Sequence, residues 1–116
     1  MRKGSSSSVR IFYPRFDREE VLRLLSERLG KLGEELPLRR VVLFGSYAKG
    51  NYDVGSDIDL LIVYRGEARE DAYAVAKRIL DLPRLEPHLY TEEEYEKLES
   101  SLDKMTEGGI ELYPAS

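Results

Sequence analysis

The residues best suited to chemistry are two carboxylates, Asp57 and Asp59, at the start of a strongly apolar run. In an extended strand the side chains at positions i and i+2 point the same way, so these acids lie side by side and can share divalent cations. Upstream, Gly45 and Ser46 follow the apolar residues 41–44, and their small side chains let a phosphate approach the backbone. Together the two patterns predict a site for a nucleotide complexed with magnesium.

Strands and helices are expected to alternate around these residues. Residues 41–44 and 57–64 have the composition of strands, and the unbroken apolar part of the second indicates a central strand covered by helices on both faces. Capping signals and the helical spacing of apolar residues predict longer helices beginning at Asp17, Ala68 and Thr91. The alternation predicts an α/β or α+β fold, with a small mixed sheet packed with helices.

Residues 85–90 are a candidate third strand that contains Pro87. Because proline cannot donate to a sheet ladder, this segment is expected to be an edge strand or to carry a bulge. Residues 9–13 are expected to form an edge strand or an arm, and residues 110–113 a terminal strand or an interaction tail. The apolar side chains near the two ends predict self-association, for example as a homodimer, or pairing with a partner. They are Ile11, Phe12, Phe16, Ile110, Leu112 and Tyr113.

The length of 116 residues suffices for one domain with a modest core. Residues 1–8, which include four consecutive serines, are interpreted as a disordered tail or a cloning remnant, so residues 9–116 form the expected single domain. No apolar stretch approaches the roughly 18 residues of a membrane span. The absence of cysteine excludes disulfides and thiolate metal sites and fits a cytoplasmic location. A net charge of −4 argues against direct binding to a nucleic-acid backbone.

The pattern Gly45-Ser46 followed by Asp57-x-Asp59 resembles the signature of the nucleotidyltransferase superfamily related to DNA polymerase β. The small size is similar to that of its minimal nucleotidyltransferases, the MNT proteins, many of which are antitoxins paired with a HEPN-domain toxin. The resemblance extends from Asp17 to about Tyr113. It implies a nucleotidyltransferase fold and the transfer of AMP from ATP to an acceptor hydroxyl. In the antitoxin branch, that hydroxyl belongs to a tyrosine of the HEPN toxin.

The resemblance also implies roles for individual residues. Gly45 and Ser46 would hold the nucleotide triphosphate, Lys49 would lie near its phosphates, and Asp57 and Asp59 would bind two Mg²⁺ ions. One metal would orient the triphosphate and assist the leaving pyrophosphate, while the other would lower the pKa of the attacking hydroxyl. A small domain can support such a reaction, because it requires mainly charge neutralisation and alignment.

A third acid is implied on a later strand, five residues before a helix cap, and Glu86 stands at that spacing from Thr91. The chain departs from the family pattern here, because the usual residue is the shorter aspartate and because Pro87 follows. Glu86 is nevertheless expected to serve as the third catalytic carboxylate and metal ligand. His88, the single histidine of the chain, is the alternative base, and a surface role for it also stays open.

Two other functions are compatible with the sequence. The domain could be a catalytically idle antitoxin that neutralises its partner by binding, or it could modify a small molecule, as aminoglycoside nucleotidyltransferases do with the help of an additional helical domain. A Glu86 side chain that converges on Asp57 and Asp59 would favour the enzyme over the idle antitoxin, which needs no third metal ligand.

Overall fold

The computed structural model describes residues 16–114 of the chain. The expected tail at residues 1–8 and the expected strand or arm at residues 9–13 lie outside the described residues. The described elements follow the order α1 (Arg18–Glu35), β2 (Leu38–Phe44), α2 (Ser46–Lys49), β3 (Ile58–Tyr64), α3 (Ala72–Leu80), β4 (Leu85–Thr91), α4 (Glu92–Met105) and β5 (Ile110–Tyr113). Within residues 16–114, no helix has the length and apolar character needed to cross a membrane.

The strands of the described chain form one mixed sheet in the order β4-β3-β2-β5. β3 pairs with β2 in antiparallel and with β4 in parallel orientation, and β5 runs antiparallel to β2. β3 is therefore an inner strand, as its apolar run predicted, and the expected small mixed sheet packed with helices is confirmed. β4 lies at an edge of the sheet, where Pro87 is tolerated. Its register with β3 shows no shift, so the alternative of a bulge at Pro87 is wrong.

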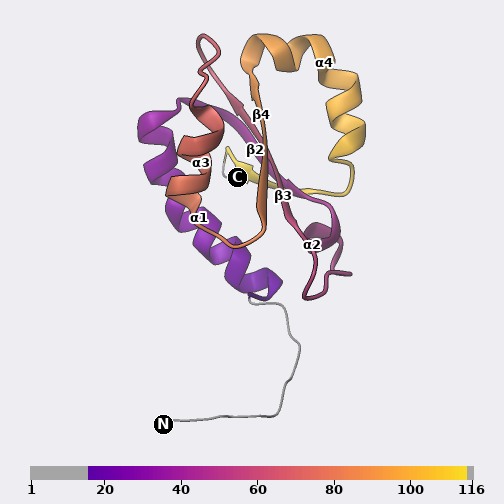
Figure 1. Ribbon diagram of the computed structural model, residues 1–116. Helices are drawn as coiled ribbons and strands as arrows, with labels where there is room; N and C mark the ends of the chain where they lie inside the picture. Colours follow the sequence, from indigo (N-terminus) through magenta and orange to yellow (C-terminus); the bar gives the residue numbers. More distant parts are fainter. Residues whose placement is uncertain (1–15, 115–116) are drawn as a thin grey trace, which may run out of the picture.

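Helices cover the two faces of the sheet unequally (Figure 1). α1 and α3 lie together on one face, over the larger apolar core that includes Leu43, Leu60 and Ile62. α4 lies on the other face, where its Tyr95 and Leu102 pack on alternate residues of β2 and β3. In Figure 1, α4 covers the upper part of this second face, and α2 lies near its lower end. The part of the second face between α4 and α2 is thus not covered by a long helix.

Capping residues define where two of the helices begin. The Asp17 carboxylate accepts a hydrogen bond from the amide of Glu20, and Thr91 Oγ1 accepts one from the amide of Glu94; both capping boxes predicted from the sequence are present. The second box also joins β4 directly to α4, because Thr91 is the last residue of the strand and the cap of the helix. The direction in which α4 leaves the sheet is therefore determined locally.

One helix boundary differs from the sequence prediction. α3 begins at Ala72, four residues later than expected. Arg69 holds the segment before α3 in a non-helical path, because its amide donates to the hydroxyl of Tyr64 on β3 and its guanidinium donates to the carbonyl of Glu35 at the end of α1.

The apolar residues near the chain ends are partly used by the fold itself. Phe16, Ile110 and Leu112 are partly buried and pack against the larger core, whereas Tyr113 is 37% exposed. Ile11 and Phe12 lie outside the described residues. Self-association through these ends stays a prediction.

Candidate active site

The alternation of side chains along the strands gathers polar residues on the face that carries α4. Leu61 of β3 packs beneath α4, so Asp59 and Asp57, two and four residues earlier, belong to the same face. In the parallel register, Asp59 is paired with Glu86 and Leu61 with His88. Glu86 and His88 of β4 therefore share the face with the two aspartates. Neighbouring strands of the sheet thus bring together acids that are far apart in the sequence.

Gly45 connects β2 to α2 and lies directly against Asp59. Its φ of +79° is in the left-handed region, and a Cβ at this position would stand 2.5 Å from Oδ2 of Asp59. Glycine is required both for the backbone conformation and for the space that the carboxylate occupies. The sequence prediction explained Gly45 only by the approach of a phosphate. The structure adds a second reason, which is that Gly45 allows Asp59 to sit at the end of β2.

His88 approaches Asp59 from β4. Its Nε2 lies 3.6 Å from Oδ1 of Asp59, and its ring packs on Phe44 with the ring centroids 5.3 Å apart. Among the described residues, this Nε2 is a buried side-chain polar atom without a hydrogen-bond partner. The interpretation of His88 as a surface residue missed this, because the contact with Asp59 exists only across the paired strands.

Burial raises the pKa of the Asp59 carboxyl above its usual range. His88 opposes this effect by stabilising the ionised form, whereas the nearby charges of Asp57 and Glu86 raise the pKa further. Mutual repulsion of the acids therefore contributes to the shift, but desolvation is its largest cause. The site holds negative charge that a bound cation would stabilise.

Arg84 is a charged residue of this region that sequence reasoning did not identify. Its Nη2 lies 2.9 Å from Oδ1 of Asp57, and its Nε donates to the carbonyl of Ser56 at 3.3 Å. Its own carbonyl accepts from the amide of Ile58 at 2.8 Å. Arg84 thus binds the residues that lead into β3 through both side chain and backbone. A basic residue just before β4 was the available signal, but its partner Asp57 lies next to it only once β4 pairs with β3.

Glu86 occupies the register position expected for a third acid, but its side chain is exposed and contacts Tyr73. The Tyr73 hydroxyl donates to Oε1 of Glu86 at 3.4 Å. Desolvation raises the pKa of Tyr73, and the charge of Glu86 adds to this rise. The register position of Glu86 thus belongs to the face of Asp57 and Asp59, but its carboxylate bends around the edge strand to Tyr73 of α3, which covers the opposite face.

The donor set fits a divalent cation in its chemistry. The donors are the carboxylate oxygens and the buried Nε2 of His88, which has no hydrogen-bond partner. The missing side chain of Gly45 leaves room for the Asp59 carboxylate among them. Among residues 16–114, no group of three or more His, Asp or Glu side chains stands ready to hold an ion. Asp57 is engaged by Arg84 and Glu86 by Tyr73, so both carboxylates would have to turn to join Asp59.

The other predicted site residues, Ser46 and Lys49, belong to the short helix α2. Gly45 is its N-cap without a side-chain capping bond, and Gly50 ends it in a left-handed conformation, with its amide donating to the carbonyl of Ser46. Lys49 is exposed. Ser46 thus directly follows Gly45 at the end of β2, and Lys49 stands one helical turn further along the chain.

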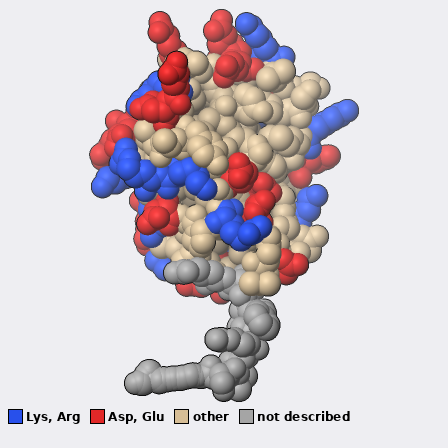
Figure 2. Space-filling model, in the orientation of Figure 1, with Lys and Arg blue, Asp and Glu red and all other residues tan. Residues whose placement is uncertain are grey.

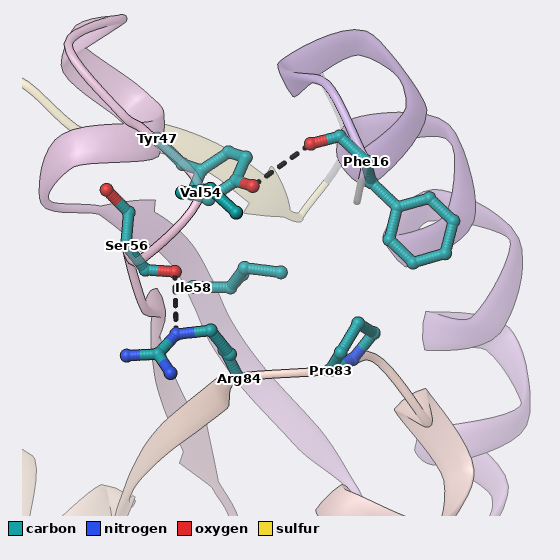
Figure 3. Close-up of a pocket in the computed structure, with 7 residues that line it drawn as sticks. All are labelled: Phe16, Tyr47, Val54, Ser56, Ile58, Pro83 and Arg84. Carbon is teal, nitrogen blue, oxygen red and sulfur yellow. Dashed lines mark hydrogen bonds between the residues drawn. The ribbon is translucent and has the colours of Figure 1, made fainter. Parts of the chain in front are cut away.

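A small pocket lies beside this region, between Ile58, Arg84 and Tyr47 (Figure 3). The Tyr47 hydroxyl donates to the carbonyl of Phe16 at one side of it, and Arg84 donates to Ser56 at the other. Its volume of about 30 Å³ has room for water but not for a nucleotide. This pocket by itself is therefore not a nucleotide site.

The surface charge gives no sign of a nucleic-acid interface on the face that Figure 2 shows. Lys and Arg side chains alternate there with Asp and Glu side chains, without a broad field of one sign. This pattern agrees with the net charge of −4.

Comparison with known proteins adds independent information. The sequence model of a family described as the nucleotidyltransferase domain matches residues 22–110. A protein of Methanocaldococcus jannaschii, provisionally named protein adenylyltransferase MJ0141, is 61% identical over 28 residues. Those residues are 24% of this chain and 28% of the archaeal protein, so the match spans less than a third of that relative.

Two crystal structures share the fold. One is a protein of Sulfolobus solfataricus provisionally described as a nucleotidyltransferase, with a TM-score of 0.53 and 22% identity over 81% of this chain and 80% of that one. The other is a mutant of the toxin-antitoxin pair MntA-HpeT, with a TM-score of 0.52 and 17% identity over 87% of this chain and 76% of that one. At these identities, the two structures establish similarity of fold.

Proposed function

Because the chain belongs to the nucleotidyltransferase domain family, we propose that it transfers AMP from ATP to a hydroxyl group of a partner protein. The observation that carries the proposal is the packing of Asp59 against Gly45, with Asp57 and Glu86 on the same sheet face. This arrangement concentrates carboxylates at the turn that the family pattern associates with the triphosphate. The provisional name of the archaeal relative, a protein adenylyltransferase, supports a protein as acceptor.

Asp57 and Asp59, joined by Glu86, are the residues that would hold divalent metal, with two Mg²⁺ ions as the expectation. When bound, such ions neutralise phosphate charge and lower the pKa of an attacking hydroxyl. The raised pKa of Asp59 supports this role, because a cation compensates the desolvated carboxylate. For these carboxylates to turn toward Asp59, the ion pair between Arg84 and Asp57 would have to break. The hydrogen bond between Tyr73 and Glu86 would have to break as well.

Gly45, Ser46 and Lys49 are proposed to hold the triphosphate. Gly45 keeps the turn free of a side chain, Ser46 can donate its hydroxyl to a phosphate oxygen, and Lys49 supplies a positive charge. Lys49 is exposed and therefore able to reach a ligand on the surface. These contacts would align the α-phosphate of ATP with the acceptor hydroxyl, which is the main requirement of the transfer.

The partner is proposed to be a HEPN-domain toxin, with a toxin tyrosine as acceptor, so that the domain acts as an antitoxin in the cytoplasm. The shared fold with the MntA-HpeT pair supports this choice. A second candidate is an antitoxin that neutralises its partner by binding alone. It is favoured by the engagement of Glu86 with Tyr73 and by the lack of a ready three-ligand group in residues 16–114.

The test is transfer of label from α-³²P-ATP to the product of the adjacent gene, co-purified with this chain. The wild type should label the partner, and Asp59→Asn should abolish labelling while the two proteins still co-purify. Asp81→Asn is the matched control, because Asp81 is exposed and adopts a left-handed φ of 45° that asparagine tolerates. Binding without labelling by the wild type would favour the idle antitoxin. The absence of both would overturn the antitoxin proposal.

A further inference from the structure

His88 presents a buried nitrogen to the carboxylate at the centre of the candidate active site. It lies on β4 two residues beyond Glu86, on the face shared with Asp59. Its Nε2 is buried and has no hydrogen-bond partner, although the imidazole as a whole is 34% exposed. A buried polar atom without a partner is unfavourable, so its presence beside a charged group calls for a functional explanation.

The distance between the two groups suits a shared cation better than a direct hydrogen bond. Nε2 of His88 and Oδ1 of Asp59 are 3.6 Å apart, which is too long for a hydrogen bond. Ligand bonds of roughly 2.1 Å place two donors on one metal ion about 3 to 3.5 Å apart. A small movement of either side chain would bring the pair to that separation.

The environment of His88 limits how far its ring can turn. The ring packs on Phe44 of β2, which is 8% exposed and is itself paired with Asp59 in the sheet register. His88 and Asp59 are thus held on adjacent strands with their polar atoms facing each other. Such positioning by the sheet is what a metal ligand requires, because little conformational freedom is then lost on binding.

We propose that His88 Nε2 is a ligand of the divalent ion held by Asp59, and that the site consequently prefers Mn²⁺ to Mg²⁺. The inference deepens the proposed function, because it assumes that Asp59 binds a metal. Imidazole nitrogen suits first-row transition metals, whereas Mg²⁺ prefers an all-oxygen shell, and Mn²⁺ accepts both donor types. The neutral imidazole binds through the lone pair of Nε2 and carries its proton on Nδ1.

The first test detects the metal–nitrogen bond directly by electron spin echo envelope modulation of bound Mn²⁺. His88 is the single histidine of the 116 residues, so ¹⁵N-histidine labelling of the untagged protein marks this imidazole alone. Spectra are recorded with Mn²⁺ alone and with Mn²⁺ and α,β-methylene-ATP. The proposal expects ¹⁴N modulation that changes to the ¹⁵N pattern on labelling. Protein-bound Mn²⁺ whose spectrum is insensitive to the label would overturn it, and no substitution is needed.

The second test compares metal affinities by calorimetry. His88→Gln should weaken Mn²⁺ binding by about tenfold or more while changing Mg²⁺ affinity less than about twofold. Asp59→Asn should abolish binding of both metals, and Asp81→Asn should leave both unchanged. Circular dichroism melting curves check that each variant is folded. An equal loss of Mn²⁺ and Mg²⁺ affinity in His88→Gln, or no loss of either, would overturn the proposal.

The metal role of Asp59 and the ligand role of His88 are distinguished by different outcomes. If Asp59→Asn abolishes metal binding but His88→Gln keeps the preference for Mn²⁺, the proposed function stands and His88 is at most a hydrogen-bond partner of Asp59. If the wild type binds neither metal, with or without the nucleotide analogue, the metal role of Asp59 fails and the proposal for His88 fails with it.

Discussion

Gly45 and Asp59 are so close that a side chain at position 45 would displace the Asp59 carboxylate. A Cβ on Gly45 would come within 2.5 Å of Oδ2 of Asp59, and the φ of +79° adds backbone strain. We expect Gly45→Ala to lower the free energy of unfolding by at least about 2 kcal/mol and to displace the carboxylate. Urea denaturation measures the first effect, and Mn²⁺ titration measures the second.

Gly108→Ala is the control for Gly45→Ala. Gly108 has the same φ of +79°, but nothing stands within 4 Å of an added Cβ. This variant should lose about 1 kcal/mol from backbone strain and keep its metal affinity. If both variants lose equal stability and both keep metal binding, the close approach of Gly45 to Asp59 has no functional consequence.

Asp59 is expected to make the metal-free protein less stable at neutral pH. Its pKa is raised in the folded state, so stability falls as pH rises from the unfolded value near 3.8 through the folded value, and stays lower above it. Asp59→Asn removes the charge and should raise the Tm in EDTA at pH 7 by a few degrees. The gain should vanish below about pH 4. Calorimetry at both pH values provides the check, and a lower Tm at pH 7 would contradict the prediction.

At the scale of elements, Arg84 connects the start of β4 with the segment leading into β3 and neutralises Asp57. Because the Arg84 side chain is 54% exposed, its ion pair contributes little to stability but competes with a cation for the carboxylate. Arg84→Gln should therefore raise the affinity for Mn²⁺ about two- to fivefold. Arg78→Gln removes a comparable exposed ion pair, with Glu35, and should change nothing. A weaker affinity in Arg84→Gln would mean that Arg84 maintains the site.

Thr91 is both the last residue of β4 and the N-cap of α4. It is 4% exposed and its hydroxyl accepts from the amide of Glu94. Thr91→Ala should lower the free energy of unfolding by about 1 to 2 kcal/mol in urea denaturation. Asp71 precedes α3 without a side-chain capping bond and makes only an exposed ion pair with Arg69, so Asp71→Ala should cost less than about 1 kcal/mol. Equal losses would indicate that the capping bond of Thr91 is unimportant.

At the scale of the whole molecule, the sheet separates two cores, and the candidate active site uses the part of one face beside the smaller core. An ion-pair network anchors α4 there: Arg40 of β2 donates to the Tyr95 hydroxyl and to Asp103 on α4, and it also pairs with Glu111 of β5. These hydrogen bonds raise the pKa of Arg40, so it stays charged. The helix is thereby held at one end of the face and leaves the acids accessible at the other.

Because the expected domain begins at residue 9, residues 1–8 are predicted to be dispensable for stability. Apart from Met1, they include no apolar side chain that could contribute to a core. Removal of residues 1–8 should change the Tm by less than about 1 °C and leave Mn²⁺ affinity unaltered. A clear fall in Tm would mean that the domain begins earlier than expected.

Local chemistry explains which features could be predicted from the sequence. The caps at Asp17 and Thr91, the buried inner strand and the placement of Asp57 and Asp59 on one face all depend on neighbours within a few residues. The late start of α3 could not be predicted, because the segment before it is also held by a hydrogen bond from the Arg69 guanidinium to the carbonyl of Glu35, at the distant end of α1. A bulge at Pro87 was a reasonable alternative, but the edge position of β4 made it unnecessary.

The sequence by itself determined the helices and strands, the family and the candidate acids, since periodicity, capping and motif spacing are properties of nearby residues. Only the tertiary structure decided what these acids contact. Strand pairing brought Glu86 and His88 beside Asp59 and placed Arg84 next to Asp57. It also placed the Asp59 carboxylate in the space that a side chain at position 45 would fill. Such contacts depend on strand order and register, which join residues that are distant in the chain and that no local pattern relates.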